Sequence, residues 1–263
     1  MTQALANLQF VQPEHRIFWS ARTGGYHPLK SKLPRRFFVQ YARAHQRPFP
    51  WRASDISSFQ LLIAELLLVQ TKAEDVVRIW RQLITRYPSA ECLARARTRS
   101  LTTLLRPLGL QNQRTRALKT LSKAIVECFD GGLPRSITDL LSLPHIGLYV
   151  ACAMACFGFG ERVPVVDANV LRVLGRITGI DPGRELRRSP KVWKAAWGIL
   201  PRNNCALHNY GVLDFAAEVC KAKSPLCQSC ALNKVCAYAR TREVVRDEDR
   251  ATRRSSRAIS SME

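Results

Sequence analysis

Four cysteines near the end of the chain have the spacing expected of ligands to a soft metal. Cys220, Cys227, Cys230 and Cys236 follow the pattern C-x6-C-x2-C-x5-C. Thiolates so close in sequence can converge on one centre, because short loops cost little entropy to close. A tetrahedral zinc ion and an iron–sulfur cluster both take four thiolates. Zinc ribbons usually carry two close cysteine pairs and this stretch has one, but the spacing alone leaves both metals open.

Two carboxylates occur in apolar surroundings where an acid is unusual. Glu65 lies in the apolar run 59–69, in which Gln60 is the only other polar residue. A helix this apolar is buried, and burial favours the protonated form of a carboxyl, which suits a general acid; pairing with an arginine is the structural alternative. Asp167 precedes an apolar-faced segment that ends at Gly179, so it fits a helix N-cap or a carboxylate held at a helix N-terminus.

The segment 143–147, L-P-H-I-G, lies between two helical patterns. A hairpin closed by Gly147 would direct backbone N–H groups and a helix N-terminus outward, where they can bind a DNA phosphate. An ordinary connection between two helices is the alternative for this motif taken alone.

These residues are positioned by a chain whose hydrophobic pattern is helical almost without interruption from residue 57. Apolar residues recur at helical spacing over 59–67, 76–84 and 118–128, and the last two segments end before Pro88 and Gly131. The segment 136–139, S-I-T-D, fits a capping box that opens a short helix before Pro144. Alternating strand patterns are scarce, and no repeat of fixed period is present. The predicted fold class is all-α.

The charge of the chain limits its partners. Its 263 residues include 41 Lys or Arg and 20 Asp or Glu, a formal net charge of +21. This excess favours nucleic acid as a partner over an acidic membrane or a merely solvated surface. No apolar run reaches the roughly 18–20 residues of a membrane span, and the N-terminus lacks the apolar core of a secretory signal. An odd number of cysteines, nine, argues against a disulfide framework.

The hairpin, the segment V-D-A-N-V-L-R-V (166–173) and the cysteine pattern occur in an order that resembles the endonuclease III and MutY branch of the helix-hairpin-helix DNA glycosylases, the HhH-GPD family. The segment P-W-R (50–52) matches the start motif of the family, and the resemblance covers about residues 47–240. It implies a two-lobed all-α fold with the active site in the cleft between the lobes, and a structural [4Fe–4S] cluster held by the four cysteines.

The implied domains follow from the same alignment of motifs. A six-helix lobe with the helix-hairpin-helix is expected over 57–162, and an iron–sulfur cluster lobe over 47–56 together with 163–240. A basic N-terminal extension, 1–46, and a mobile tail, 241–263, lie outside the resemblance.

The resemblance also implies a reaction, hydrolysis of the bond between a flipped-out base and its deoxyribose through an oxocarbenium-like transition state. Asp167 matches the essential aspartate, which stabilises that cation or positions water. Glu65 aligns with the glutamate of the S-E-x-x-L-Q-Q-T-type motif of MutY and the thymine-mismatch glycosylases. Tyr149 occupies the position of the Schiff-base lysine of bifunctional members, which predicts a monofunctional enzyme with weak or no AP lyase activity. A core aromatic side chain is the structural alternative for Tyr149.

The residues that the resemblance assigns to DNA contact lie in three loops. They are, in chain order, Gln70 and Thr71; Leu110, Gln111 and Arg114; and His145, Ile146 and Gly147. The first two loops match the family segments that enter the duplex beside the flipped base. His145 replaces the usual first glycine of L-P-G-I-G, so a positive φ is expected at this residue.

The combination of Glu65, Tyr149, V-D-A-N and G-L-x-N-Q-R is most similar to the thymine/uracil mismatch glycosylases. The sequence therefore predicts removal of thymine or uracil opposite guanine from double-stranded DNA, by a monomer with no membrane partner. The expected location is the cytoplasm, with the nucleoid, in a prokaryote or the nucleus in a eukaryote. Two alternatives stay open: a MutY-like adenine glycosylase without the C-terminal reader domain, and a non-catalytic iron–sulfur protein that only binds DNA.

Overall fold

The computed structural model describes residues 36–180 and 189–241, and these ranges are helical and contain no strand. The predicted all-α fold class is confirmed. The described residues form two compact units, one of 47–165 and 202–206, the other of 36–46, 166–180, 189–201 and 207–241. None of the described helices combines the length and apolarity needed to cross a bilayer.

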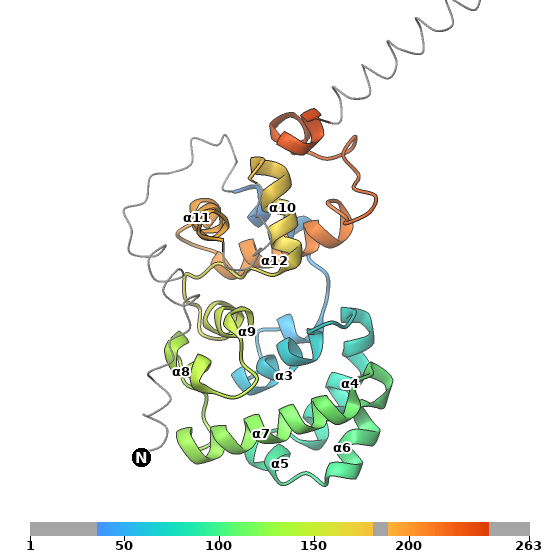
Figure 1. Cartoon of the computed structure of the whole chain (residues 1–263), viewed down its shortest axis with the longest axis vertical. Coiled ribbons are helices and arrows are strands. Elements are labelled where there is room, and N and C mark those ends of the chain that lie inside the picture. The colour runs from blue at the N-terminus through green and yellow to red at the C-terminus, as the bar shows by residue number, and fades with distance from the viewer. Residues whose placement is uncertain (1–35, 181–188, 242–263) are drawn as a thin grey trace, which may run out of the picture. The chain divides into compact units, whose positions relative to one another are not determined.

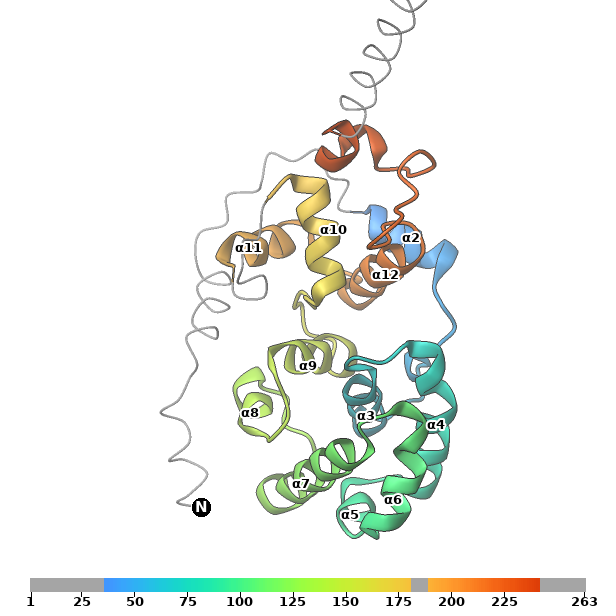
Figure 2. The same ribbon diagram turned by 45° about the vertical axis from the view of Figure 1, so that its right-hand side comes forward.

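The first unit is a bundle of α-helices that surrounds one apolar helix. Its helices are α3 (Ser58–Leu68), α4 (Ala73–Arg86), α5 (Ala90–Ala94), α6 (Thr98–Leu105), α7 (Gln111–Phe129), α8 (Ile137–Ser142) and α9 (Leu148–Ala153). Shorter elements are η2 (Pro50–Arg52), η3 (Arg106–Leu108) and the π-helical η4 (Met154–Gly158), which continues α9. Helix α3 lies among α4, α7 and α9 (Figures 1 and 2), and this position explains why its sequence is apolar on nearly every face.

Side chains define where these helices begin. Ser57 and Gln60 form a reciprocal capping box at the start of α3. The predicted cap at Ser136 is confirmed, because its Oγ accepts a hydrogen bond from the Asp139 N–H at 3.0 Å. Trp80 of α4 donates its indole N–H to the Gln60 carbonyl at 2.8 Å. This hydrogen bond joins the capped end of α3 to α4.

The second unit contains α2 (Phe37–His45), α10 (Ala168–Thr178), α11 (Pro190–Ile199), most of α12 (Cys205–Glu218) and η5 (Asn233–Val235). Phe37, Phe38 and Tyr41 of α2 surround the Phe215 ring of α12, with ring centroids 5.5, 5.6 and 5.3 Å away. A Cβ on Gly211 would lie 2.0 Å from the Phe38 carbonyl oxygen, so only glycine allows this close approach of α2 and α12.

The unit boundaries differ from the predicted domain boundaries. Residues 163–165 and 202–206, expected with the cluster lobe, belong to the first unit, and two longer segments are also assigned differently. Helix α2 belongs to the second unit although residues 1–46 were expected to be an extension, because its Phe38, Val39 and Ala42 are buried. Residues 47–56, expected with the cluster lobe, belong to the first unit, where the Trp51 ring packs edge-on against Trp80. Residues 1–35 of the predicted extension and 242–263 of the predicted tail lie outside the described residues.

Candidate functional site

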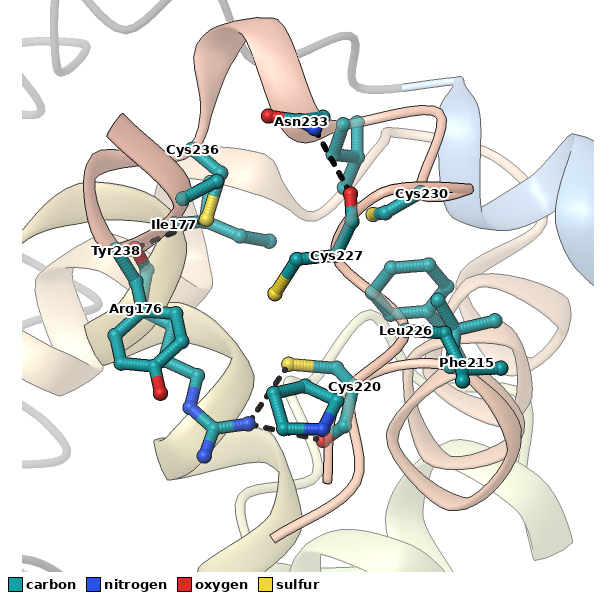
Figure 3. A pocket seen from close by; sticks show the side chains of 14 residues that line it. Arg176, Ile177, Phe215, Cys220, Leu226, Cys227, Cys230, Asn233, Cys236 and Tyr238 are labelled. Carbon is teal, nitrogen blue, oxygen red and sulfur yellow. Dashed lines mark hydrogen bonds between the residues drawn. The ribbon is translucent and has the colours of Figure 1, made fainter. Parts of the chain in front are cut away.

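The four predicted metal ligands line a single cavity within the second unit. The sulfur atoms of Cys220, Cys227, Cys230 and Cys236 are directed toward the same space (Figure 3). The loop is held in place by Asn233, whose side-chain amide donates to the Cys227 carbonyl at 2.9 Å. In the ranges that the structure describes, no three His, Cys, Asp or Glu side chains are arranged to hold one metal ion. Four thiols from one short loop therefore face one cavity.

Arg176, from α10, provides positive charge next to this cavity. Its guanidinium lies 3.5 Å from the Cys220 sulfur and donates to the Lys221 and Ala222 carbonyls at 2.7 and 2.9 Å. It also stacks on the Tyr238 ring, 4.8 Å from the centroid. These contacts fix the first turn of the cluster loop beside α10.

Burial governs the acidity of two of the cavity thiols. It is the main cause that raises the pKa of Cys230 and Cys236, and the neighbouring cysteines raise each pKa further through charge repulsion. A cation bound among these thiols would offset this repulsion. The donor set is that of a soft metal centre.

Asp167 caps α10, and both of its carboxylate oxygens accept hydrogen bonds. Oδ1 accepts the Val170 N–H at 2.7 Å, and Oδ2 accepts the side-chain N–H of Asn169 at 2.7 Å. The half-buried carboxylate is thereby fixed at the N-terminus of a helix. The sequence offered two alternatives for Asp167, a helix N-cap or a carboxylate held at a helix N-terminus, and the structure shows both.

Arg172, which the sequence analysis did not single out, connects α10 to the cluster loop. Its guanidinium donates to Asn169 Oδ1 and to the carbonyls of Cys220 and Ala216, each at 2.9 Å. Burial lowers the pKa of Arg172. One sequence signal could have indicated this role. Asn169, Arg172 and Arg176 have helical spacing, so they lie on one face of the helix.

The other two predicted catalytic residues lie in the first unit. Glu65 is buried in α3, with 2% of its surface exposed, as its apolar neighbours predicted. Tyr149 is half-buried in the first turn of α9. Helices α3 and α9 pack against each other.

Two of the predicted DNA-contacting loops lie beside each other, together with part of the third. Gln70, Leu110, Arg114 and His145 line one cavity, whose other walls are apolar except for Gln113. Gln70 and Leu110 have positive φ angles of 58° and 50°, and the Leu110 side chain is 55% exposed. Thr71 is half-buried next to Gln70, and Gln111 is the first residue of α7.

The hairpin between α8 and α9 has the conformation expected from its sequence. His145 has a φ of 65°, which confirms the expected positive angle, and its Nε2 lies 2.9 Å from Thr120 Oγ1 of α7. Ile146 is buried, whereas Gly147 is exposed. A Cβ on Gly147 would meet no atom within 4 Å, and its φ of −94° suits any residue. Its surface is therefore open for close approach by another molecule.

Sequence comparison assigns the chain to a family. A family model described as "HhH-GPD superfamily base excision DNA repair protein" matches residues 63–196. The chain belongs to the HhH-GPD superfamily. The predicted family is thus confirmed, and with it the class of base excision DNA glycosylases.

Curated relatives of this HhH-GPD protein include a thymine-DNA glycosylase of Aeropyrum pernix, 35% identical over 78% of this chain and 93% of the relative. A thymine/uracil-DNA glycosylase of Pyrobaculum aerophilum is 36% identical over 78% of this chain and 90% of the relative. Among solved structures, a thermostable thymine-DNA glycosylase superposes with a TM-score of 0.74 at 29% identity and covers 78% of this chain and 94% of its own. An endonuclease III–DNA complex has the same fold, with a TM-score of 0.69 at 24% identity.

Proposed function

We propose that this HhH-GPD protein is a monofunctional glycosylase that hydrolyses the N-glycosidic bond of thymine or uracil opposite guanine in duplex DNA. The observation that carries the proposal is the Asp167 carboxylate, held at the start of α10 by hydrogen bonds to both oxygens. The names of the thymine and thymine/uracil relatives support the substrate class. The product of such an enzyme is an abasic site, for further repair.

The proposed reaction develops positive charge on deoxyribose as the base departs. A fixed carboxylate stabilises an oxocarbenium-like transition state without reorganising, because its position is set before the reaction begins. Asp167 takes this role, and its Oδ atoms can also orient the attacking water. Its two hydrogen-bond donors keep the carboxylate in one orientation.

Glu65 is proposed as the general acid for the departing base. Its carboxyl lies in an apolar helix with 2% exposure, and desolvation favours the protonated form that can donate. Tyr149 presents a phenol where the bifunctional enzymes use an amine. A phenol cannot form an imine with C1′, so strand cleavage should be weak or absent.

Gln70, Leu110 and Gly147 are proposed to contact DNA as the resemblance implies. Gln70 and Leu110 project from neighbouring loops toward the gap left by the flipped nucleotide, while the exposed Gly147 lets a phosphate approach the hairpin backbone. We further propose that the protein acts as a monomer on DNA, in the cytoplasm with the nucleoid in a prokaryote or in the nucleus in a eukaryote.

We propose a [4Fe–4S] cluster as the cofactor, held by Cys220, Cys227, Cys230 and Cys236. The fit rests on four thiols directed into one cavity and on Arg176 beside Cys220. When bound, the cluster would cross-link the loop 220–236 and so keep its basic surface in shape. Zinc is the rival occupant.

Metal analysis distinguishes the two occupants. Protein purified without oxygen should be brown and contain about four irons and four sulfides per chain. Cys227→Ser should lose this colour, while Cys128→Ser, at an exposed cysteine outside the cavity, should keep it. A colourless protein with one zinc per chain would refute the cluster.

A panel of duplexes tests the activity. Single-turnover assays on T:G, U:G, A:G and adenine opposite oxidised guanine, with T:A as control, should show excision from T:G and U:G only. Release of adenine alone would establish the adenine-glycosylase alternative, which relatives such as the 32% identical Mycobacterium tuberculosis adenine DNA glycosylase keep open. Tight binding to all duplexes without excision would establish the non-catalytic alternative.

A further inference from the structure

Two exposed apolar side chains of the first unit are carried by loops with unusual backbone conformations. Val69 and Leu110 are 48% and 55% exposed. Gln70, next to Val69, has a φ of 58°, and Leu110 itself has a φ of 50°. A non-glycine residue in this left-handed region is strained, and such strain persists only where the surroundings enforce it. Some contact must therefore hold both loops.

Arg114 of α7 makes that contact with both loops. Toward one loop its Nε donates to the Gly109 carbonyl at 3.1 Å. Toward the other, its two terminal nitrogens donate to the carbonyls of Leu67 and Val69 at 3.3 and 3.2 Å and to Thr71 Oγ1 at 2.6 Å. One side chain of α7 thus joins its own N-terminal loop to residues that precede Arg114 by 43 to 47 positions.

The orientation of these bonds determines what Arg114 can do. A guanidinium has five N–H donors, and four of them are used within the protein. The group is half-buried, and burial lowers its pKa. A phosphate ligand needs donors directed outward in a fork, whereas this fork is directed at backbone carbonyls.

We infer that Arg114 is a positioning residue that clamps the loops 67–71 and 109–110 together, so that Val69, Gln70 and Leu110 enter DNA as one preformed unit. This replaces the direct DNA contact expected from the sequence. The inference rests on the proposed function for its effect on excision, but the clamp itself is a property of the free protein.

Three variants separate a clamp from a phosphate contact. Arg114→Lys keeps the charge and loses the planar fork, and Arg114→Gln loses both. Arg116→Gln, two residues along α7 at an exposed position, removes the same charge from the same helix and serves as the matched control. Thermal unfolding of each variant first establishes that it is folded.

Hydrogen exchange in the free protein is the decisive measurement. The N–H groups of Thr71 and Gly109 donate to Leu68 and Arg106 carbonyls, one in each loop, so each amide reports on its own loop. Both should exchange about tenfold faster in Arg114→Lys and in Arg114→Gln, and neither should change in Arg116→Gln. Unchanged exchange at either amide in Arg114→Lys would overturn the clamp.

Excision then tests the consequence for the reaction. Arg114→Lys should lower single-turnover excision roughly ten- to hundredfold, and Leu110→Ala should cost much less in that background than in wild type. Two results would identify a phosphate contact instead. The first is that the losses from Arg114→Lys and Leu110→Ala are additive. The second is that Arg114→Lys is as active as wild type, while the slope of log DNA affinity against log salt concentration falls by about one in Arg114→Gln only. If wild type excises nothing, the proposed function fails while the exchange result still decides the clamp.

Discussion

Asp167 and Cys220 are joined by a continuous chain of hydrogen bonds. Asp167 Oδ2 accepts from Asn169, Asn169 Oδ1 accepts from Arg172, and Arg172 Nε donates to the Cys220 carbonyl, over distances of 2.7, 2.9 and 2.9 Å. The proposed catalytic carboxylate and the first cysteine of the cluster loop therefore depend on the same arginine. A substitution that breaks this chain of hydrogen bonds should therefore change both the excision rate and the stability of the cluster loop.

Arg172→Lys tests that dependence. Lysine cannot make the three bonds of the guanidinium, so we expect the free energy of unfolding to fall by roughly 1.5–3 kcal/mol in chemical denaturation, with a lower excision rate. Asn169→Ala removes the bonds of Asn169 to Asp167 and Arg172 but leaves the bonds from Arg172 to the Cys220 and Ala216 carbonyls, so it should lower excision roughly tenfold and leave the cluster loop intact. Arg78→Lys, at an exposed position, is the control. If Arg172→Lys retained as much iron and as much activity as this control, the link between Asp167 and the cluster loop would be contradicted.

Asp167→Asn separates catalysis from capping. Asparagine is as good an N-cap as aspartate, so α10 should keep its start, although the bond from Asn169 is lost. Excision should fall at least roughly 100-fold because the transition-state cation loses its counter-charge, while duplex affinity stays within about threefold. Asp167→Ala should in addition lose roughly 1 kcal/mol of stability. An Asn variant with wild-type excision would remove Asp167 from the reaction.

Tyr149→Lys should gain a covalent intermediate. An amine in the first turn of α9 can attack C1′ of an abasic site, and borohydride reduces the resulting imine to a stable cross-link visible by gel electrophoresis. Tyr149→Phe is the control, since it keeps the ring and has no amine. No cross-link in the Lys variant would place this position away from the sugar.

Gly147→Ala should weaken DNA binding without destabilising the protein. Its backbone angles suit alanine, and the added Cβ meets no atom within 4 Å, so the melting temperature should stay within about 2 °C. The methyl group would stand between the hairpin backbone and a bound phosphate, and the dissociation constant for duplex should rise about tenfold. Unaltered affinity in fluorescence anisotropy would show that no phosphate approaches this glycine.

The helical architecture was predictable because its signals are local. The spacing of apolar residues located α3, α4 and α7, and Ser136, Asp167 and Gly179 marked helix ends through their capping chemistry. The left-handed angle at His145 was also predictable, since the position is one where glycine is usual.

Long-range contacts were not predictable from such signals. Arg172 and Arg176 read as ordinary basic residues and Arg114 as a DNA contact, and most of their hydrogen-bond partners lie more than 40 residues away in sequence. Most of those partners are backbone carbonyls, which carry no sequence signature. The assignment of α2 to the second unit depended likewise on Phe215 and Gly211 of α12, whose pairing with Phe38 no local pattern indicates.

The clamp at Arg114 has a consequence for how such an enzyme can change its substrate. Three of its four acceptors are backbone carbonyls, which are the same whatever side chain the residue carries. The residues at 69, 70 and 110 can therefore be exchanged without removing the contacts that hold the loops. The backbone of the two loops is held independently of the side chains at their tips. A library randomised at those three positions is therefore the natural starting point for designing glycosylases that recognise other lesions.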